Sequence, residues 1–221
     1  MCGIAGIYHF NSPDKSINED HLKKMLSVIW YRGPDESGMY VGSNVGIGNV
    51  RLSIIDLSSG QQPISVRNNR FRIVYNGELF NYIELRKELE KLGCEFFTNA
   101  DTEVVVQAYA QYGTDCLKKF NGQYAIAIWD NKEKSLFLAR DRVGIRPLFY
   151  SKLNGTFAFC SEIKGLFQIP EIARKINPKG LAQIFTFWTT ITPATPFEDI
   201  FEVRPGHYML INSEKIQQVK Y

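Results

Sequence analysis

The distribution of apolar residues along the chain predicts many short strands that come in groups. Apolar and aromatic runs bounded by Gly, Pro, Asn and Asp are typical of strands. Such runs predict strands at 3–10, 38–42, 45–50, 71–75, 95–98, 123–129, 135–140, 147–151, 156–160, 207–211 and 216–221. The Asn154-Gly155 pair predicts a tight hairpin, and the Asn76-Gly77 pair is expected to end the strand at 71–75.

Apolar residues that recur about every 3.6 positions indicate helices between these strands. The first helix is predicted to begin at an Asn18 cap and to end near Trp30. The second opens on a capping box formed by Asn81 and Glu84, and the third is expected to end at Gly113. The predicted helices span 19–30, 82–92, 101–112, 162–167 and 178–187.

The order of these elements favours antiparallel sheets with helices outside over a parallel, doubly wound sheet. Strands and helices come in groups, whereas a parallel sheet needs them to alternate strictly. We divide the chain into a domain at 1–190 and a carboxy-terminal extension at 191–221. The extension begins with a proline-rich, extended stretch at 193–206 and closes with a hairpin. Because Tyr221 directly follows a predicted strand, we expect a linker to a further domain.

Composition and charge are those of an ordinary globular protein. With 44% apolar and 22% charged residues, the 221-residue chain can bury a sizeable core. The net charge of +3 is too small to indicate binding to nucleic acid or to a membrane surface. No apolar run is long enough to cross a bilayer, and the first residues lack the features of a signal peptide. We therefore expect neither nucleic-acid nor membrane partners.

The cysteines and histidines give no sign of a metal site. No CxxC motif joins the four cysteines, which stand at positions 2, 94, 116 and 160. This spacing favours reduced thiols and a cytoplasmic location over a disulfide framework or a zinc site. The histidines are scattered and have no metal-ligand spacing; they are His9, His21 and His207. Their scarcity also argues against a paired Cys–His nucleophile.

Cys2 can carry both a nucleophile and a base if Met1 is removed. Its thiolate would be the nucleophile. Its α-amine would titrate near about 7.7–8.0, so part of it would be free to accept a proton at neutral pH. While Met1 stays attached, the nitrogen of Cys2 is an amide and cannot act as a base. Position alone favours a buried, inert cysteine, and the other motifs reverse that preference.

Cleavage of an amide also requires donors for the oxyanion and groups that hold the substrate. Asn76 and Gly77 can supply a side-chain amide and a backbone N–H, although the pair is also typical of a plain turn. Arg51 can clamp a carboxylate, or it can brace a loop. Asp101 can hold an ammonium group, or it can cap the helix that follows. Arg51 and Asp101 together would suit the two charges of an amino acid.

A second polar segment lies between two apolar strands. It contains Arg140, Asp141, Arg142 and Arg146. Opposite charges this close in sequence commonly pair with one another. We interpret the segment as a structural ion-pair network.

Six motifs stand in a fixed order along the chain. They are MCGIAGI at 1–7, RGPDESG at 32–38, RLSIIDLSSGQQP at 51–63, NGELFNY at 76–82, DTE at 101–103 and RDRVGIRPLFY at 140–150. In order and spacing the chain resembles the amino-terminal glutaminase domain of glutamine-dependent asparagine synthetases. These are class II glutamine amidotransferases of the N-terminal-nucleophile hydrolase type. The resemblance implies an α+β fold, a four-layer αββα sandwich of two antiparallel sheets flanked by helices.

The resemblance also implies a role for each candidate residue. Cys2 would attack the side-chain amide of glutamine, with Asn76 and Gly77 as the oxyanion hole. Arg51 would hold the carboxylate of glutamine, and Asp101 its α-amine. The same pocket would be lined by Leu52, Ser53, Ile54, Ile55 and Glu78. A glutamyl thioester would form, ammonia would leave, and water would release glutamate.

Partners and cofactors follow from the same resemblance. Ammonia would pass to a carboxy-terminal synthetase domain in cis, which adds it to an activated aspartate. That domain is absent from these residues, so ATP and Mg²⁺ are expected only there and no cofactor or metal is expected here. Glutamine is the expected substrate, and a homodimer is a further candidate assembly.

The chain departs from the family pattern at one position, and two alternative functions stay open. Tyr31 stands where the family usually has His, which we expect to change only the packing around the site. GIRPL is shared with the amidophosphoribosyltransferase branch, whereas RGPD and RLSIIDL are the asparagine-synthetase forms. One alternative is the same chemistry feeding a sugar acid or another carboxylate. The other is a catalytically silent binding module, against which the retention of Cys2 and its partners argues.

Overall fold

The computed structural model describes all 221 residues and contains two six-stranded sheets. All pairings between the named strands are antiparallel. The first sheet has the order β10 (Ile200–Glu202), β8 (Phe149–Leu153), β9 (Thr156–Cys160), β1 (Gly3–His9), β3 (Val45–Arg51), β2 (Glu36–Val41). The second has the order β12 (Ile216–Lys220), β11 (His207–Ile211), β7 (Ser135–Arg140), β6 (Gly122–Asp130), β5 (Phe71–Leu79), β4 (Ile64–Val66).

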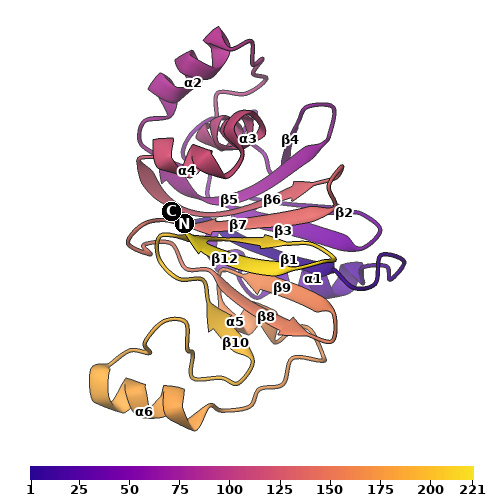
Figure 1. The fold of residues 1–221 in the computed structure, drawn as a ribbon, viewed down its shortest axis with the longest axis vertical. Helices are drawn as coiled ribbons and strands as arrows, with labels where there is room; N and C mark the ends of the chain where they lie inside the picture. The colour runs from indigo at the N-terminus through magenta and orange to yellow at the C-terminus, as the bar shows by residue number, and fades with distance from the viewer.

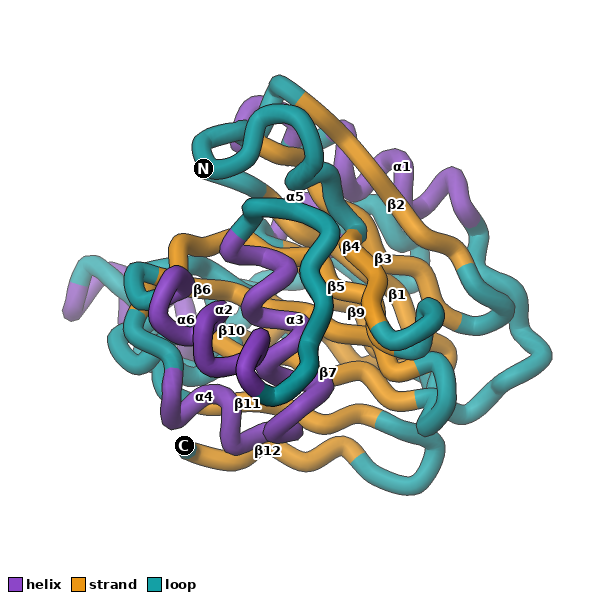
Figure 2. The backbone as a smooth tube through the Cα atoms, turned by 90° about the horizontal axis from the view of Figure 1, so that it is seen from above, coloured by secondary structure: helices purple, strands orange, loops and turns teal.

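Helices cover the outer face of each sheet. On the second sheet lie α2 (Tyr82–Lys91), α3 (Asp101–Tyr112) and α4 (Cys116–Lys119), and on the first lie α1 (Glu19–Ser27) and α5 (Ile163–Leu166). Seen from above, α3 and α4 lie across the strands (Figure 2). The order helix, sheet, sheet, helix (Figure 1) confirms the predicted αββα sandwich.

The central strands are buried on both faces, which explains their continuous apolar runs. In β6, Ile126 and Ile128 pack toward the helices, while Ala127 and Trp129 pack toward the first sheet. The rings of Trp129 and Tyr8 meet edge to face at 5.1 Å and join β6 to β1 across the two sheets. Three apolar cores thus fill the spaces between the four layers.

Several element boundaries differ from the predictions. The strand at 71–75 does not end at Asn76; β5 continues to Leu79 because β6 pairs with it along its whole length. The predicted strand at 95–98 is wrong, since the backbone N–H groups of Phe97 and Thr98 donate to the carboxylate of Glu103 instead. Strand β4 and helix α4 were not predicted because each is only three or four residues long.

Helix ends follow the predictions in part. Asn18 caps α1 by accepting from the backbone N–H of Asp20, and Gly113, at φ +57°, ends α3. The capping box at the start of α2 is wrong: the side chain of Asn81 donates to Lys119 O and accepts from Asn121 N. Tertiary partners have replaced the local ones, because the segment after α4 passes beside the start of α2.

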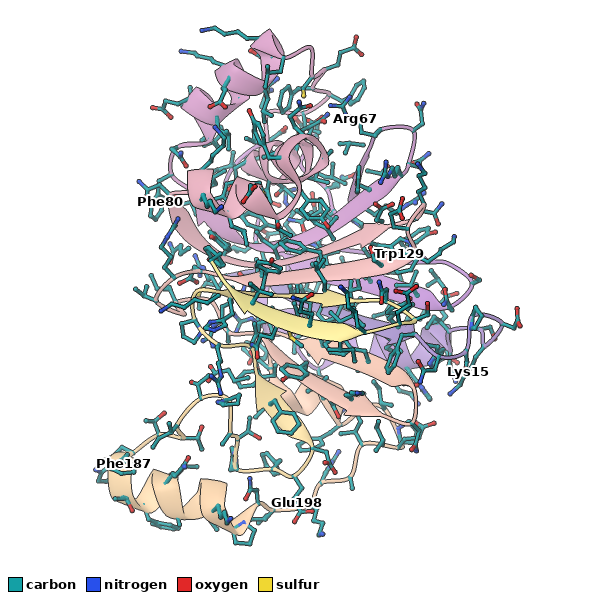
Figure 3. All side chains as sticks on the ribbon, viewed as in Figure 1. Lys15, Arg67, Phe80, Trp129, Phe187 and Glu198 are labelled. Atoms are coloured by element: carbon teal, nitrogen blue, oxygen red, sulfur yellow. The ribbon has the colours of Figure 1, made fainter.

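The carboxy-terminal segment belongs to both sheets. Strand β10 is added to an edge of the first sheet, and β11 and β12 to an edge of the second. Helix α6 (Pro178–Phe187) lies apart from the sandwich (Figure 1), and Phe187 at its end is 56% exposed (Figure 3). The boundary at 190 stays a prediction. None of the helices has the length and apolar character needed to span a bilayer.

Candidate active site

A cavity of about 130 Å³ lies where the start of β1, the end of β3, the second half of β5 and the start of α3 meet. All predicted site residues except Ser53 line it. Its lining is Met1, Cys2, Arg51, Leu52, Ile54, Ile55, Gln62, Tyr75, Asn76, Gly77, Glu78, Asp101, Thr102 and Arg146. Residues separated by up to 145 positions therefore share one small space.

Cys2 is the one cysteine at this cavity. It is half-buried and directly precedes β1, with its Sγ 3.7 Å from Leu52 O. The other three cysteines are buried in the cores. Burial raises the pKa of Cys160 to about 12 and raises that of Cys116 further still. A molecule in the cavity can therefore reach Cys2 and no other thiol.

Asn76 presents an unpartnered donor to the cavity. Its side chain is only 1% exposed, and its Nδ2 has no hydrogen-bond partner. Buried side-chain amides normally have partners, so an orphan of this kind commonly marks a ligand position. Asn76 lies inside β5, opposite Ala125 of β6, rather than in the turn that the Asn-Gly pair also suggested.

The backbone N–H of Gly77 also faces away from β6. Tyr124, which lies opposite Gly77, has its N–H and C=O bonded to Asp141 instead. In an antiparallel ladder this pattern directs the N–H of Gly77 to the other side of the strand. Tyr75, two residues earlier, donates on that side to Gln62. A Cβ at Gly77 would lie 2.4 Å from Gln123 O, so the position requires glycine.

Arg51, the last residue of β3, is buried and braces the loop that follows. Its Nη1 donates to Glu36 Oε2 at 2.8 Å, and its Nη2 donates to the carbonyls of Ile55 at 2.9 Å and Asp56 at 2.6 Å. A guanidinium has five N–H donors, so these three bonds leave two for another acceptor. Arg51 thus fits both predicted interpretations, since it braces a loop and also lines the cavity.

Asp101 is buried and has no cationic partner. It does not cap α3; its Oδ2 accepts from Leu79 N at 3.0 Å and from the Tyr75 hydroxyl at 3.2 Å. Burial raises the pKa of Asp101 in spite of these hydrogen bonds. A buried carboxylate is costly unless a cation compensates it, so the site is suited to an ammonium group.

The loop after β3 is held by Asp56, which the sequence reasoning missed. The carboxylate of Asp56 accepts from the backbone N–H groups of Ser59 and Asn99 and from the Ser59 hydroxyl. The Ser59 hydroxyl and these N–H groups lower the pKa of Asp56 to about 2. An Asp followed three residues later by Ser is a local turn signal that could have predicted it. Ser53 does not line the cavity: its N–H donates to Asp35, and its buried hydroxyl has no hydrogen-bond partner.

The segment 140–146 corrects one prediction. Its charged residues do not pair with one another. Asp141 accepts backbone N–H groups, and Arg140 donates to the carbonyls of Gly144, Arg146 and Val203. Arg140 pairs instead with Glu202 of β10. The segment is therefore held mainly by bonds between side chains and backbone.

Besides Met1, four residues line the cavity without having been predicted. They are Gln62, Tyr75, Thr102 and Arg146. Arg146 stands out because its buried Nε has no partner. No local pattern indicated this position, since the fold alone carries the segment after β7 to the cavity.

Comparisons with known proteins agree on one family. The family model described as a glutamine amidotransferase domain matches residues 1–221. Asparagine synthetase [glutamine-hydrolyzing] 3 of Bacillus subtilis is 36% identical over 225 residues, which cover 100% of this chain and 36% of that protein. Amidase chry2 of Gibberella zeae is 34% identical over 235 residues, covering 100% of this chain and 34% of that protein. The chain thus spans about a third of the length of these relatives.

A solved structure shares the fold. The glutamine phosphoribosylpyrophosphate amidotransferase of B. subtilis superposes with a TM-score of 0.71. The two are 21% identical, and the match covers 99% of this chain and 49% of that one. At this identity the likeness concerns the sandwich and its topology.

Proposed function

Because the chain belongs to the glutamine amidotransferase domain family, we propose that it hydrolyses glutamine to glutamate and ammonia. One observation carries the proposal. The cavity that holds the Cys2 thiol also holds two free donors, from Asn76 and Gly77, and a buried Asp101 without a cation. A nucleophile, an oxyanion site and an ammonium site are the parts that cleavage of an amino-acid amide requires.

The proposed reaction begins once Met1 has been removed. The freed α-amine of Cys2 takes the thiol proton, and the sulfur attacks the side-chain carbonyl carbon of glutamine. The Asn76 amide and the Gly77 N–H donate to the oxygen that becomes negative. The ammonium returns its proton to the leaving nitrogen, ammonia departs and a glutamyl thioester remains. Water, activated by the same amine, then displaces the sulfur and releases glutamate.

Two charged residues hold the substrate in this proposal. Arg51 keeps free N–H donors for the α-carboxylate, and Asp101 accepts the α-ammonium. The walls are supplied by Leu52, Ile54, Ile55 and Glu78. Ser53 contributes through the loop, since its side chain does not line the cavity.

The acceptor of the ammonia is the finer part of the proposal. We propose a carboxy-terminal domain in cis that uses ATP and Mg²⁺ to amidate aspartate. The support is that relatives named asparagine synthetase are about three times as long as this chain. A second candidate is another carboxylate, such as a sugar acid; its support is that some relatives of similar coverage are named amidase rather than asparagine synthetase. A cytoplasmic location, with no cofactor in residues 1–221, completes the proposal.

Replacement of the nucleophile tests the chemistry. In protein shown by intact mass to lack Met1, Cys2→Ala is expected to lower glutamate release by several powers of ten. Cys94→Ala, a buried cysteine outside the cavity, is the matched control and should keep its activity. Unchanged hydrolysis in Cys2→Ala would refute the proposal. A parent that neither releases glutamate nor reacts at Cys2 with a glutamine-like electrophile would favour a silent binding module.

A further inference from the structure

Removal of Met1 leaves Cys2 with a covalent neighbour on one side only. Chain ends are poorly ordered unless other contacts hold them. The ladder between β1 and β9 ends at the pair Ala5 and Cys160. Beyond it, Ser161 continues the pairing, because its N–H donates to Ile4 O at 2.8 Å and its Oγ accepts from Ile4 N at 2.9 Å. The residues after β9 therefore extend the support of β1 toward the nucleophile.

The carbonyl of Cys2 is held by a guanidinium. Arg32 Nε donates to Cys2 O at 3.0 Å, and Arg32 Nη1 donates to Glu162 Oε1 at 2.8 Å. The Tyr31 hydroxyl donates to the same oxygen of Glu162, and Lys164 pairs with the other oxygen at 3.2 Å. The side chains of Arg32 and Glu162 are only 9% and 20% exposed. A continuous series of hydrogen bonds thus links Cys2, Arg32, Glu162 and Tyr31.

We propose that Glu162 and Tyr31 are positioning residues for Cys2, acting through Arg32. The proposal rests on the proposed glutaminase function, in which the sulfur of Cys2 must lie in line with the carbonyl carbon. Neither Glu162 nor Tyr31 lines the cavity, so neither touches the substrate. Glu162 and Tyr31 hold the Arg32 side chain in place, and Arg32 in turn holds Cys2.

The charge of Glu162 is suited to this task. Burial acts to raise its pKa, but hydrogen bonds from Tyr31, Arg32 and Lys164 outweigh burial and lower it. Glu162 is therefore an anion at neutral pH. A long Arg side chain has many rotamers, and a charged acceptor at its far end selects one of them. Arg32 needs such an anchor, because its buried Nη2 has no partner of its own.

Tyr31 extends the anchor to the surface. It is 62% exposed, and the ammonium of Lys164 lies 4.1 Å from the centre of its ring. Its hydroxyl supplies a second donor to the oxygen that Arg32 binds. The unusual residue before the RGPD motif thus has a definite contact, which a phenylalanine could not make.

Loss of this anchor is expected to lower kcat and to leave KM unchanged. Glutamine is held by Arg51 and Asp101 on other elements, so ground-state binding does not depend on Glu162. Attack depends on the sulfur being within about 0.5 Å of its productive place, and a displacement of about 1 Å costs about 100-fold in rate. A positioning role therefore predicts a lower kcat at unchanged KM. Because a loss of folded protein would lower the apparent kcat in the same way, local hydrogen exchange near Cys2 is needed to distinguish the two.

The experiment compares Glu162 with a matched ion pair elsewhere. Glu202, 18% exposed, pairs with Arg140 at 2.7 Å and lies outside the cavity. In full-chain protein lacking Met1, Glu162→Ala is expected to lower kcat about 10- to 100-fold, with KM for glutamine within about twofold. Glu162→Gln, which keeps an acceptor, should recover most of the loss, and Tyr31→Phe should lose several-fold. Glu202→Ala should leave kcat within about twofold of the parent.

A second readout does not depend on activity. Hydrogen exchange at the amides of residues 3–5 should be faster in Glu162→Ala than in Glu202→Ala. Equal kcat values and equal exchange in the two variants would overturn the inference, as would a rise in KM at unchanged kcat. A parent that neither releases glutamate nor reacts at Cys2 with a glutamine-like electrophile would refute the proposed function alone, because the exchange comparison would still test the anchor. Should Glu162→Ala fail to fold, Glu162→Gln and the exposed Tyr31→Phe carry the same comparison.

Discussion

The position of Asp101 in the sequence does not reveal that its carboxylate is buried. An aspartate at the first position of a helix normally faces solvent and its carboxylate accepts from nearby N–H groups. In α3 it is buried beneath β5 and accepts from the hydroxyl of Tyr75 and the N–H of Leu79. The fold thus keeps a carboxylate without a cation where an amino acid could supply one.

Asp101→Asn is expected to raise the KM for glutamine about 10- to 100-fold, because one charged contact to the ammonium is lost. The same change should stabilise the ligand-free protein at neutral pH. The folded state raises the pKa of Asp101, so it disfavours ionisation. The penalty is absent below the unfolded pKa of about 3.9 and grows as pH rises through the folded pKa.

Two measurements check this prediction. Thermal unfolding without glutamine should show the variant above the parent at neutral pH, with the gap closing near about pH 3. Steady-state kinetics should show the rise in KM. An unchanged KM would contradict the assignment of Asp101 to the ammonium, whatever the thermal result.

Met1 allows a prediction about the base. Activity should be proportional to the fraction of chains that lack Met1, because an amide nitrogen cannot accept the thiol proton. Preparations with different extents of processing, quantified by intact mass, should fall on a line through zero. Substantial turnover by chains that retain Met1 would require a different base.

At the scale of elements, the helix ends show which caps form through local hydrogen bonds and which are replaced by tertiary contacts. Asn18 caps α1 through a local bond, whereas the side chain of Glu84 makes no hydrogen bond and Glu84 is exposed on α2. The sequence pattern gives both residues a capping role. Only contacts across the fold distinguish them, because Asn81 has been drawn to the segment after α4.

Asn18→Ala is therefore expected to lower the free energy of unfolding by about 0.5–2 kcal/mol. Glu84→Ala should change it by less than about 0.5 kcal/mol, as for other surface positions. Urea denaturation of the two variants checks the contrast. A loss of equal size in Glu84→Ala would mean that the capping box forms in solution.

Strands with strong periodicity could be predicted, and strands fixed by their neighbours could not. The apolar run of β6 and the Asn154-Gly155 hairpin, with φ of +47° and +74°, follow from local chemistry. The continuation of β5 beyond Asn76 depends on pairing with β6, about fifty residues away. The stretch 95–98 reads as a strand but is bound by Glu103, a contact that no local pattern encodes.

The candidate site shows the same division. The motifs were enough to propose Cys2, Arg51, Asn76 and Asp101 as site residues. Only the fold brings these four residues to one cavity. Arg146 could not be proposed, because its segment carries several arginines and the fold alone selects which one faces the cavity.

At the scale of the whole molecule, the two sheets are joined by one apolar core. Trp129 and Tyr8 pack against each other in this core, one from each sheet. Large side chains in such a place leave a cavity when they are truncated, because the flanking sheets cannot collapse onto it.

Trp129→Ala is expected to destabilise the protein by about 3–5 kcal/mol. Trp30→Ala, where the tryptophan is 43% exposed, is the matched control and should cost far less. Chemical denaturation monitored by far-UV circular dichroism avoids dependence on tryptophan fluorescence. Similar losses in the two variants would show that the core between the sheets does not dominate stability.

The position of β1 has a consequence for biogenesis. The strand lies between β3 and β9, so its second neighbour exists only after residue 160 has been synthesised. At about 5–20 residues per second, the start of the nascent chain stays accessible for on the order of ten to thirty seconds. After folding, Met1 lines the cavity beside the thiol and is still 57% exposed. An aminopeptidase can therefore reach Met1 after the strand has paired as well as before, so maturation of Cys2 need not be completed during translation.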